Sequence, residues 1–319
     1  MSDRRREGAH MFSVLTWNVE NLYQPGGEFG PASEQVYTAK LDHLAAIITG
    51  VGADVLALQE IGDPAALADL QQHVGGGWPH AAVSDHPDQR GIRVAILARH
   101  PISGPVQLHA FPDAALDRIP TPDRQLVTTL GRGVLQATVT PPAGPPVRIV
   151  TAHLKSKLLS FPGNRRFPRN ENERARGAGY ALLRRTGEAV AVRVHLNDQM
   201  TDDDTPTVLL GDLNDEPGAV TTQLLQGPED GDPKRPDKGD DVRLYNLADR
   251  LAAGRAYSRV YKKRQELIDH ILVSRELLFT VTQVDSLVEG IASITESVDT
   301  RREAAVPDHA PVFARFELP

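Results

Sequence analysis

Short apolar runs that end in polar residues recur along the chain and predict an α/β protein. Residues 53–60 and 207–210 are almost entirely aliphatic and predict strands that are buried on both faces. Other alternating or apolar segments predict further strands at residues 12–18, 93–98, 133–140, 147–153, 267–273 and 312–316. Apolar positions at helical spacing predict a helix that starts at the N-cap Ser33 and stops near Gly52, and a second over residues 172–196.

Segments rich in proline, glycine and aspartate separate these elements. They predict loops at residues 101–122, 141–146 and 227–241. Apolar strands resume after each loop, so none of them marks a domain boundary. With 319 residues and 40% hydrophobic content, the chain could form one large domain or two smaller ones. We expect a single domain over residues 11–319, preceded by a disordered polar arm at residues 1–10.

The amino-acid composition excludes several classes of protein. The absence of cysteine excludes a disulfide framework, thiolate zinc and a cysteine nucleophile, and it suits a reducing compartment. The polar N-terminus contains no apolar signal segment, and no run approaches the roughly 18 apolar residues of a membrane span. We therefore expect a cytoplasmic monomer. The net charge of -7 argues against a protein that holds nucleic acid by bulk electrostatics, although a local basic patch or a metal can reverse the field.

Two polar side chains follow the buried strand at 207–210. Asp212 and Asn214 lie two residues apart in an extended segment, so they point to the same side at the carboxyl end of the strand. Open α/β sheets usually place their chemistry at that end. An Asx turn that closes the strand would explain the same residues. The functional alternative is a carboxylate that takes a proton from water, beside an amide that holds the water or a phosphate oxygen.

Other strand ends carry candidates of the same kind. Asn18 ends the first strand, Glu60 the second and His153 a later one. A turn asparagine, a solvated carboxylate and a structural histidine are the alternatives. Glu60 has no basic neighbour in the sequence, so it must face water or a cation, which makes it a metal-ligand candidate. Asp269 and His270 lie inside an apolar strand and must point to opposite faces, so Asp269 needs a partner.

A basic segment stands out in this acidic chain. Residues 155–193 contain ten Lys and Arg residues but only three Glu residues. Its first part is a loop with Phe161 and Phe167 among arginines, a composition that suits phosphates and stacked bases. The rest predicts a helix whose charges could simply be solvated. The candidate substrate-binding residues of this segment are Lys155, Arg165, Arg166 and Arg169.

Six short motifs together resemble the endonuclease/exonuclease/phosphatase superfamily, which includes deoxyribonucleases, apurinic endonucleases, sphingomyelinases and inositol polyphosphate phosphatases. They occur in that family's order and span residues 12–316. No P-loop, G-x-S-x-G motif or His/Cys metal spacing competes with them. The motifs are Trp17-Asn18, Leu58-Gln59-Glu60, His153-Leu154-Lys155-Ser156, Gly211-Asp212-Leu213-Asn214, Ile268-Asp269-His270-Ile271 and Pro307-Asp308-His309-Ala310-Pro311.

The resemblance implies a four-layered α/β/β/α sandwich with two mixed β-sheets face to face. It implies that Glu60 binds Mg²⁺ or Mn²⁺, with Asn18 beside it and Asp308 near the metal. Asp212 would deprotonate the attacking water, and Asn214 would hold the water or the phosphate. His309, steadied by Asp269, would contact the scissile phosphate, and His153 would hydrogen-bond a phosphate oxygen. These roles suit phosphoester hydrolysis, which needs a hard cation, hydrogen-bond donors and one base.

The substrate is less closely defined than the reaction. Apurinic endonucleases carry tyrosine where this chain has His153, so the resemblance favours the deoxyribonuclease, sphingomyelinase and phosphatase branches. The basic loop favours a polyanion. We therefore expect a nuclease or nucleic-acid phosphodiesterase, with DNA preferred over RNA. The second hypothesis is a phosphatase or phosphodiesterase for a small phosphorylated molecule or lipid head group. A binding module without activity ranks third, because every catalytic position is filled.

Overall fold

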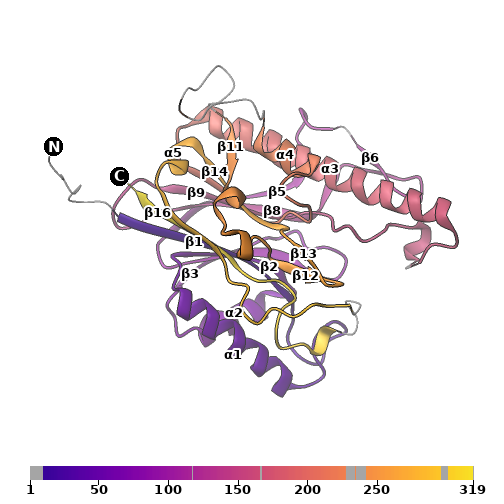
Figure 1. Ribbon diagram of the computed structural model, residues 1–319, viewed down its shortest axis with the longest axis horizontal. Helices are drawn as coiled ribbons and strands as arrows, with labels where there is room; N and C mark the ends of the chain where they lie inside the picture. Colours follow the sequence, from indigo (N-terminus) through magenta and orange to yellow (C-terminus); the bar gives the residue numbers. More distant parts are fainter. Residues whose placement is uncertain are drawn as a thin grey trace.

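Two six-stranded β-sheets pack face to face, with helices on both outer sides (Figure 1). The structure is a computed structural model that describes residues 10–116, 118–165, 167–227, 234, 242–295 and 301–318. Most of the polar insertion predicted at 227–241 lies outside the described residues, as do residues 1–9 of the predicted arm. His10 is already the first residue of a strand.

The first sheet is mixed. Its β1 pairs in parallel with β2, whereas its other neighbouring strands pair antiparallel. In spatial order the strands are β15 (Val281–Ser286), β16 (Val312–Leu318), β1 (His10–Leu22), β2 (Val55–Ile61), β4 (Arg93–Ala98) and β3 (His80–Val83).

The second sheet has the same mixed character, because β9 and β10 are parallel and the other pairs are antiparallel. Its strands are β11 (Leu244–Asn246), β14 (Asp269–Ser274), β10 (Thr207–Asp212), β9 (Val147–His153), β8 (Thr129–Val139) and β5 (Ile102–Ala110). Two short hairpins lie outside the sheets: β6 (Ile119–Pro120) with β7 (Leu126–Val127), and β12 (Arg259–Tyr261) with β13 (Arg264–Glu266).

Helices complete the four predicted layers. In Figure 1, α1 and α2 lie below the sheets, while α3 and α4 lie above them. Ser33 caps α1 by accepting a hydrogen bond from the Val36 amide, and Gly52 ends it with a φ of 63°. The helices are α1 (Glu34–Val51), α2 (Pro64–His73), α3 (Glu171–Asp202), α4 (Val220–Gln226) and α5 (Arg275–Leu278), with 3-10 turns at Pro162–Asn164, Leu247–Arg250, Ala253–Arg255 and Arg301–Glu303.

Three apolar clusters hold the layers together. The central cluster contains Phe12 and Val55 from the first sheet and Leu135 and Val208 from the second, so it fills the space between the sheets. The other clusters join the first sheet to α1 and α2, and the second sheet to α3 and α4. Because β2 and β10 contribute side chains to two clusters each, their sequences are apolar on both faces, as the aliphatic runs predict.

The structure corrects two predicted elements. Residues 102–110, predicted as loop, form β5 at the edge of the second sheet. Most of the side chains of this strand are exposed, so it carries little of the apolar pattern that identifies a strand. The helix predicted at 172–196 extends over 171–202. No helix among the described residues is long and apolar enough to cross a membrane, α3 included.

Candidate active site

The polar residues predicted at strand ends meet at one edge of the two sheets. Asp212 ends β10, where it lies opposite His153 of the parallel strand β9 and opposite Asp269 of the antiparallel strand β14. A Cβ atom on Gly211 would lie 1.9 Å from the carbonyl oxygen of Ala152. Glycine is therefore required just before Asp212 for β9 and β10 to approach this closely.

Asp212 is the centre of the cluster, with 2% of its surface exposed. Its Oδ2 accepts a hydrogen bond from Asn18 Nδ2 at 3.0 Å and lies 3.3 Å from His153 Nε2. Its Oδ1 accepts from the backbone amide of Asn214 at 3.0 Å. The Asx turn considered as an alternative is thus present, but only one carboxylate oxygen takes part in it. The other oxygen, Oδ2, is directed toward Asn18 and His153.

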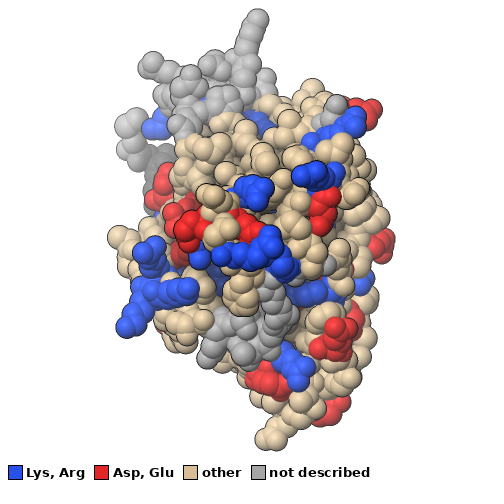
Figure 2. All heavy atoms as spheres, turned by 90° about the vertical axis from the view of Figure 1, so that its right-hand side faces the viewer, with Lys and Arg blue, Asp and Glu red and all other residues tan. Residues whose placement is uncertain are grey.

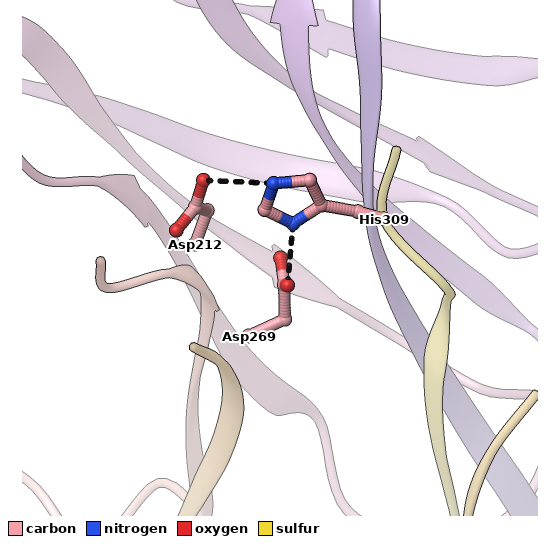
Figure 3. A group of neighbouring side chains, drawn as sticks. All are labelled: Asp212, Asp269 and His309. Atoms are coloured by element: carbon pink, nitrogen blue, oxygen red, sulfur yellow. Dashed lines mark hydrogen bonds and ion pairs between the residues drawn. The ribbon is translucent and has the colours of Figure 1, made fainter. Parts of the chain in front are cut away.

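His309 and Asp269 form a buried pair beside Asp212 (Figure 3). His309 Nδ1 lies 2.6 Å from Asp269 Oδ2, and its Nε2 lies 4.0 Å from Asp212 Oδ2. Asp269 Oδ2 also accepts a hydrogen bond from Ser258 Oγ at 2.7 Å. The imidazole is therefore held on its Nδ1 side, and its Nε2 side is directed toward Asp212.

Burial and charge shift the pKa values of these groups in opposite directions. Burial, reinforced by Asp269, raises the pKa of Asp212 to about 7, although His309 opposes the shift. Burial alone would lower the pKa of His309, but the carboxylates of Asp269 and Asp308 outweigh it and raise that pKa to about 10. Burial, with the charge of Arg132, holds the pKa of His153 well below its usual range. Near neutrality His309 is thus cationic and His153 neutral.

Glu60 lies next to this group at the end of β2, with a left-handed φ of 63°. Its Oε1 is 3.4 Å from Asn18 Nδ2, and its Oε2 accepts from the Asn21 amide at 3.0 Å. Asn18 therefore bridges Glu60 and Asp212 through its NH₂ group. The amide oxygen of Asn18 accepts instead from the backbone of Glu20 at 2.9 Å.

Asp308 joins the cluster through a network that the sequence did not predict. Its Oδ1 lies 3.9 Å from His309 Nε2, and its Oδ2 lies 3.3 Å from Arg259 Nη2. Its backbone amide donates to Glu20 Oε2 at 3.0 Å. Glu20 in turn pairs bidentately with Arg301, at 2.5 and 2.7 Å. Glu20 therefore links two of the three predicted metal ligands, Asn18 and Asp308.

Two sets of residues could hold a cation: the cluster of Asp212, Asp269 and His309, and the predicted ligands Glu60, Asn18 and Asp308. One ligand atom from each of Asp212, Asp269 and His309 lies within 4.8 Å of the others. His309 already pairs through Nδ1 with Asp269, and Mg²⁺ prefers oxygen ligands to imidazole nitrogen. Glu60 fits better, because it receives only neutral N–H donors and forms no ion pair within the described part of the chain. Its carboxylate is a hard oxygen donor of the kind that Mg²⁺ and Mn²⁺ prefer.

The basic loop is partly neutralised. Arg165 Nη1 lies 3.1 Å from Glu173 Oε2, and the Arg169 guanidinium lies 2.5 Å from Glu173 Oε1. Lys155 Nζ donates to the carbonyls of Ser156 and Leu158, within its own loop. Arg166 lies outside the described residues. On the face toward which the N-terminal end of α3 points, basic and acidic side chains are interspersed (Figure 2).

The structure thus brings Asn18, Glu60, His153, Asp212, Asn214, Asp269, Asp308 and His309 together, and their individual roles stay predictions. Asn214 also donates from Nδ2 to the Leu154 carbonyl at 3.0 Å. Sequence reasoning missed Glu20, Ser258 and Arg301. Only Glu20 carries a signal, a glutamate two residues after Asn18 at the end of an apolar strand.

This fold and site define a phosphoester hydrolase of the endonuclease/exonuclease/phosphatase class. The model of the Endonuclease/Exonuclease/phosphatase family matches residues 15–293. The chain belongs to this family, whose members are metal-dependent phosphoesterases. No match was found among curated protein sequences.

Solved structures support the fold at low sequence identity. A family protein from Leptotrichia buccalis is 16% identical, with a TM-score of 0.56, and the match covers 96% of this chain and 100% of that one. TDP2 from Caenorhabditis elegans is 16% identical, with a TM-score of 0.55 and coverage of 97% and 74%. ANGEL2, described as a 2′,3′-cyclic phosphatase, is 15% identical, with a TM-score of 0.56 and coverage of 97% and 96%.

The first prediction concerns the partly buried pair of Glu20 and Arg301. We expect Glu20→Gln to lower the free energy of unfolding by about 1–3 kcal/mol, because it removes a charge-assisted bidentate contact from Arg301, whose side chain is 12% exposed. Glu303→Gln is the matched control. Its pair with Arg302 is about half exposed, and glutamine keeps an oxygen that can accept from the Ala32 amide, so the loss should be less than about 1 kcal/mol. Urea denaturation measures both. Equal small losses would contradict a structural role for Glu20.

Proposed function

We propose that the protein is a Mg²⁺- or Mn²⁺-dependent nuclease or nucleic-acid phosphodiesterase, in which Asp212 activates the attacking water. The observation that carries this proposal is the environment of Asp212. One buried carboxylate with a pKa of about 7 faces a cationic His309 across 4.0 Å, between Asn18 and His153. A base and an acid with opposed pKa shifts, fixed side by side, are what hydrolysis at neutral pH requires.

The cation would be held by Glu60 and Asp308. Asn18 would join as a ligand if its amide turned, because its oxygen now accepts from Glu20. When bound, the cation supplies Lewis-acid stabilisation of the negative charge that develops on the phosphate oxygens. Glu60 is the principal ligand in this proposal.

The other residues act on the water and the phosphate. Asp212 accepts the proton of the water, and Asn214 holds the water or a phosphate oxygen near it. His309, kept protonated and oriented by Asp269, donates from Nε2 to the phosphate. His153, which is neutral, donates from one ring nitrogen to a second phosphate oxygen. Its Nδ1 is buried and has no hydrogen-bond partner in the described part of the chain.

The basic loop would bind the phosphate backbone through Arg165, Arg166, Arg169 and Lys155. Glu173 offsets only part of this charge, since two arginines share one carboxylate. The side chain of Arg169 is 74% exposed, so its remaining N–H groups can reach a ligand. A polyanionic substrate suits this loop, and we propose DNA in preference to RNA.

A small phosphorylated molecule is the second candidate. The similarity to ANGEL2, described as a 2′,3′-cyclic phosphatase, supports it, as does the engagement of the basic loop by Glu173. Plasmid, single-stranded DNA, RNA, a chromogenic phosphodiester and a 2′,3′-cyclic nucleotide should be digested in parallel with Mg²⁺ or Mn²⁺. Preference for the polymers supports the first candidate, and preference for the cyclic nucleotide supports the second. Inactivity on every substrate would reject both.

The metal prediction concerns Glu60. EDTA should abolish activity, and Glu60→Gln should raise the metal concentration for half-maximal activity at least tenfold, which corresponds to about 1.4 kcal/mol of binding. Calorimetric titration of the metal into the protein gives a second readout that is independent of turnover. Glu28→Gln, at an exposed loop position, is the control. A metal titration that Glu60→Gln leaves unchanged would remove Glu60 from the ligand set.

The base prediction concerns Asp212. Asp212→Asn keeps the size of the side chain but removes its basicity, so kcat should fall by about 10²–10⁴-fold with little change in substrate affinity. Steady-state kinetics at saturating metal measures both parameters, with the exposed Asp204→Asn as control. A variant within threefold of the wild-type rate would refute the assignment of Asp212 as base.

The pH prediction follows from the two shifted groups. Activity needs Asp212 ionised, so it should rise with pH up to about 7, and it needs His309 protonated, so it should fall above about 10. A cation beside Asp212 moves the rising limb to lower pH, which makes the falling limb diagnostic. Asp269→Asn removes the carboxylate that stabilises the imidazolium, so the falling limb should move to lower pH.

Two measurements check this shift. One is kcat/KM against pH at saturating metal, and the other is an NMR titration of His309 in the metal-free protein. If Asp269→Asn slows the reaction but leaves both curves in place, Asp269 does not set the protonation of His309.

A further inference from the structure

The loop between β3 and β4 is built rigidly around Asp88. Its Oδ1 accepts hydrogen bonds from the backbone amides of Arg90 at 2.9 Å and Ile92 at 3.1 Å. Its own amide donates to the Ile92 carbonyl at 2.8 Å, and the Gly91 amide donates back to the Asp88 carbonyl at 2.9 Å. The Arg90 carbonyl also accepts from Tyr23 Oη at 2.9 Å. The backbone of Arg90 is therefore fixed from both sides.

The two arginines at this loop differ in how their charge is balanced. Arg132 pairs with Asp88 Oδ2 at 3.2 Å and points toward the carbonyls of His153 and Leu154. Arg90 forms no ion pair with any carboxylate of the described residues. The single hydrogen bond of its guanidinium within that part of the chain is to Asn21 Oδ1, at 3.2 Å. Most of its N–H donors thus remain available.

Arg90 lies at the rim of the active site, on the side of Glu60. Asn21 connects the two, because its backbone amide donates to Glu60 Oε2 and its side chain accepts from Arg90. Along this chain of hydrogen bonds, Asn21, Glu60 and Asn18 stand between the guanidinium and Asp212. The charge of Arg90 also contributes to the lowered pKa of His153.

We propose that Arg90 binds a phosphate of the substrate other than the one that is hydrolysed. Under the proposed function, the scissile phosphate lies among Asn18, Asp212, His153 and His309, each of the other three being within 4.0 Å of Asp212. A half-buried guanidinium that no carboxylate neutralises matches a second phosphate, which it can bind bidentately. The preferred substrate then carries at least two neighbouring phosphates, as an oligonucleotide does. This inference rests on the proposed phosphodiesterase function.

The test compares a substrate with one phosphate to a substrate with several. Bis(4-nitrophenyl) phosphate is the first and a thymidine tetranucleotide the second. Arg90→Gln should lower the ratio of kcat/KM for the tetranucleotide to that for the small diester at least tenfold, and Arg90→Lys should restore part of it. Arg93→Gln is the matched control, because Arg93 lies three residues away and, among the described residues, its guanidinium donates only to the Gly91 carbonyl. It should leave the ratio unchanged.

A binding measurement keeps this inference separate from the proposed reaction. The affinity of Asp212→Asn protein for the tetranucleotide should fall with salt, and adding Arg90→Gln should reduce the log–log slope by about 0.7, the value for one lost phosphate contact on a single strand. That slope change supports the subsite even if the wild type hydrolyses neither substrate, which would refute only the proposed reaction. An unchanged slope, or equal kinetic losses on both substrates, would overturn the role of Arg90.

Discussion

The structure depends on burying several carboxylates at one edge of two apolar sheets. Glu20, Asp212, Asp269 and Asp308 are each less than a tenth exposed. An ionised carboxylate in such a place is costly unless it is paired or hydrogen-bonded. Three of the four lie beside a cationic side chain. Arg301 balances Glu20, Arg259 balances Asp308, and His309 balances Asp269. Asp212 has no full counter-charge, and burial raises its pKa to about 7. Burial raises the pKa of Glu20 as well, despite the contact with Arg301.

Left-handed backbone conformations are concentrated around the site. Four residues other than glycine that belong to the site or its supports have left-handed φ values between 48° and 63°: Glu20, Asn21, Glu60 and Asn214. Such conformations persist only where surrounding contacts compensate for their cost. Here the compensation is visible, since the Asn21 and Asn214 amides each donate to a site carboxylate. These residues lie at or just after the ends of β1, β2 and β10, where the polar side chains of the site meet.

The sequence predicted the parts of the site that depend on local order. Asp212 and Asn214 were identified because a buried strand ends there, and the opposite orientations of Asp269 and His270 follow from strand geometry alone. His270 indeed turns away, to the Asp215 carbonyl, while Asp269 faces His309. Contacts between distant segments carried no such signal. Glu20 and Arg301 are 281 positions apart, and no periodicity relates them.

The basic loop illustrates a different limit. Composition identified its arginines, but the pairing of Arg165 and Arg169 with Glu173 depends on how the loop folds back onto the first turn of α3. There Asn170 caps the helix and Glu173 accepts from the Arg169 amide. A charge count gives the excess of arginine correctly without revealing which guanidinium groups remain available. Arg90 lies outside the basic segment, so a charge count does not single it out, although its guanidinium forms no ion pair among the described residues.

One short segment fixes the consecutive residues Asp308 and His309 in two different roles. Ser258 donates to Asp269, which holds His309, and the neighbouring Arg259 pairs with Asp308. The Ser258 carbonyl accepts from the Ala310 amide at 2.7 Å, so the two chain segments are also joined through their backbones. Because Asp308 and His309 are tied to adjacent residues of one partner segment, neither can shift without moving the other. Asp308, a predicted metal ligand, and His309, the predicted donor to the phosphate, therefore keep a fixed separation. A reaction in which negative charge develops on neighbouring phosphate oxygens requires both groups to be held in place.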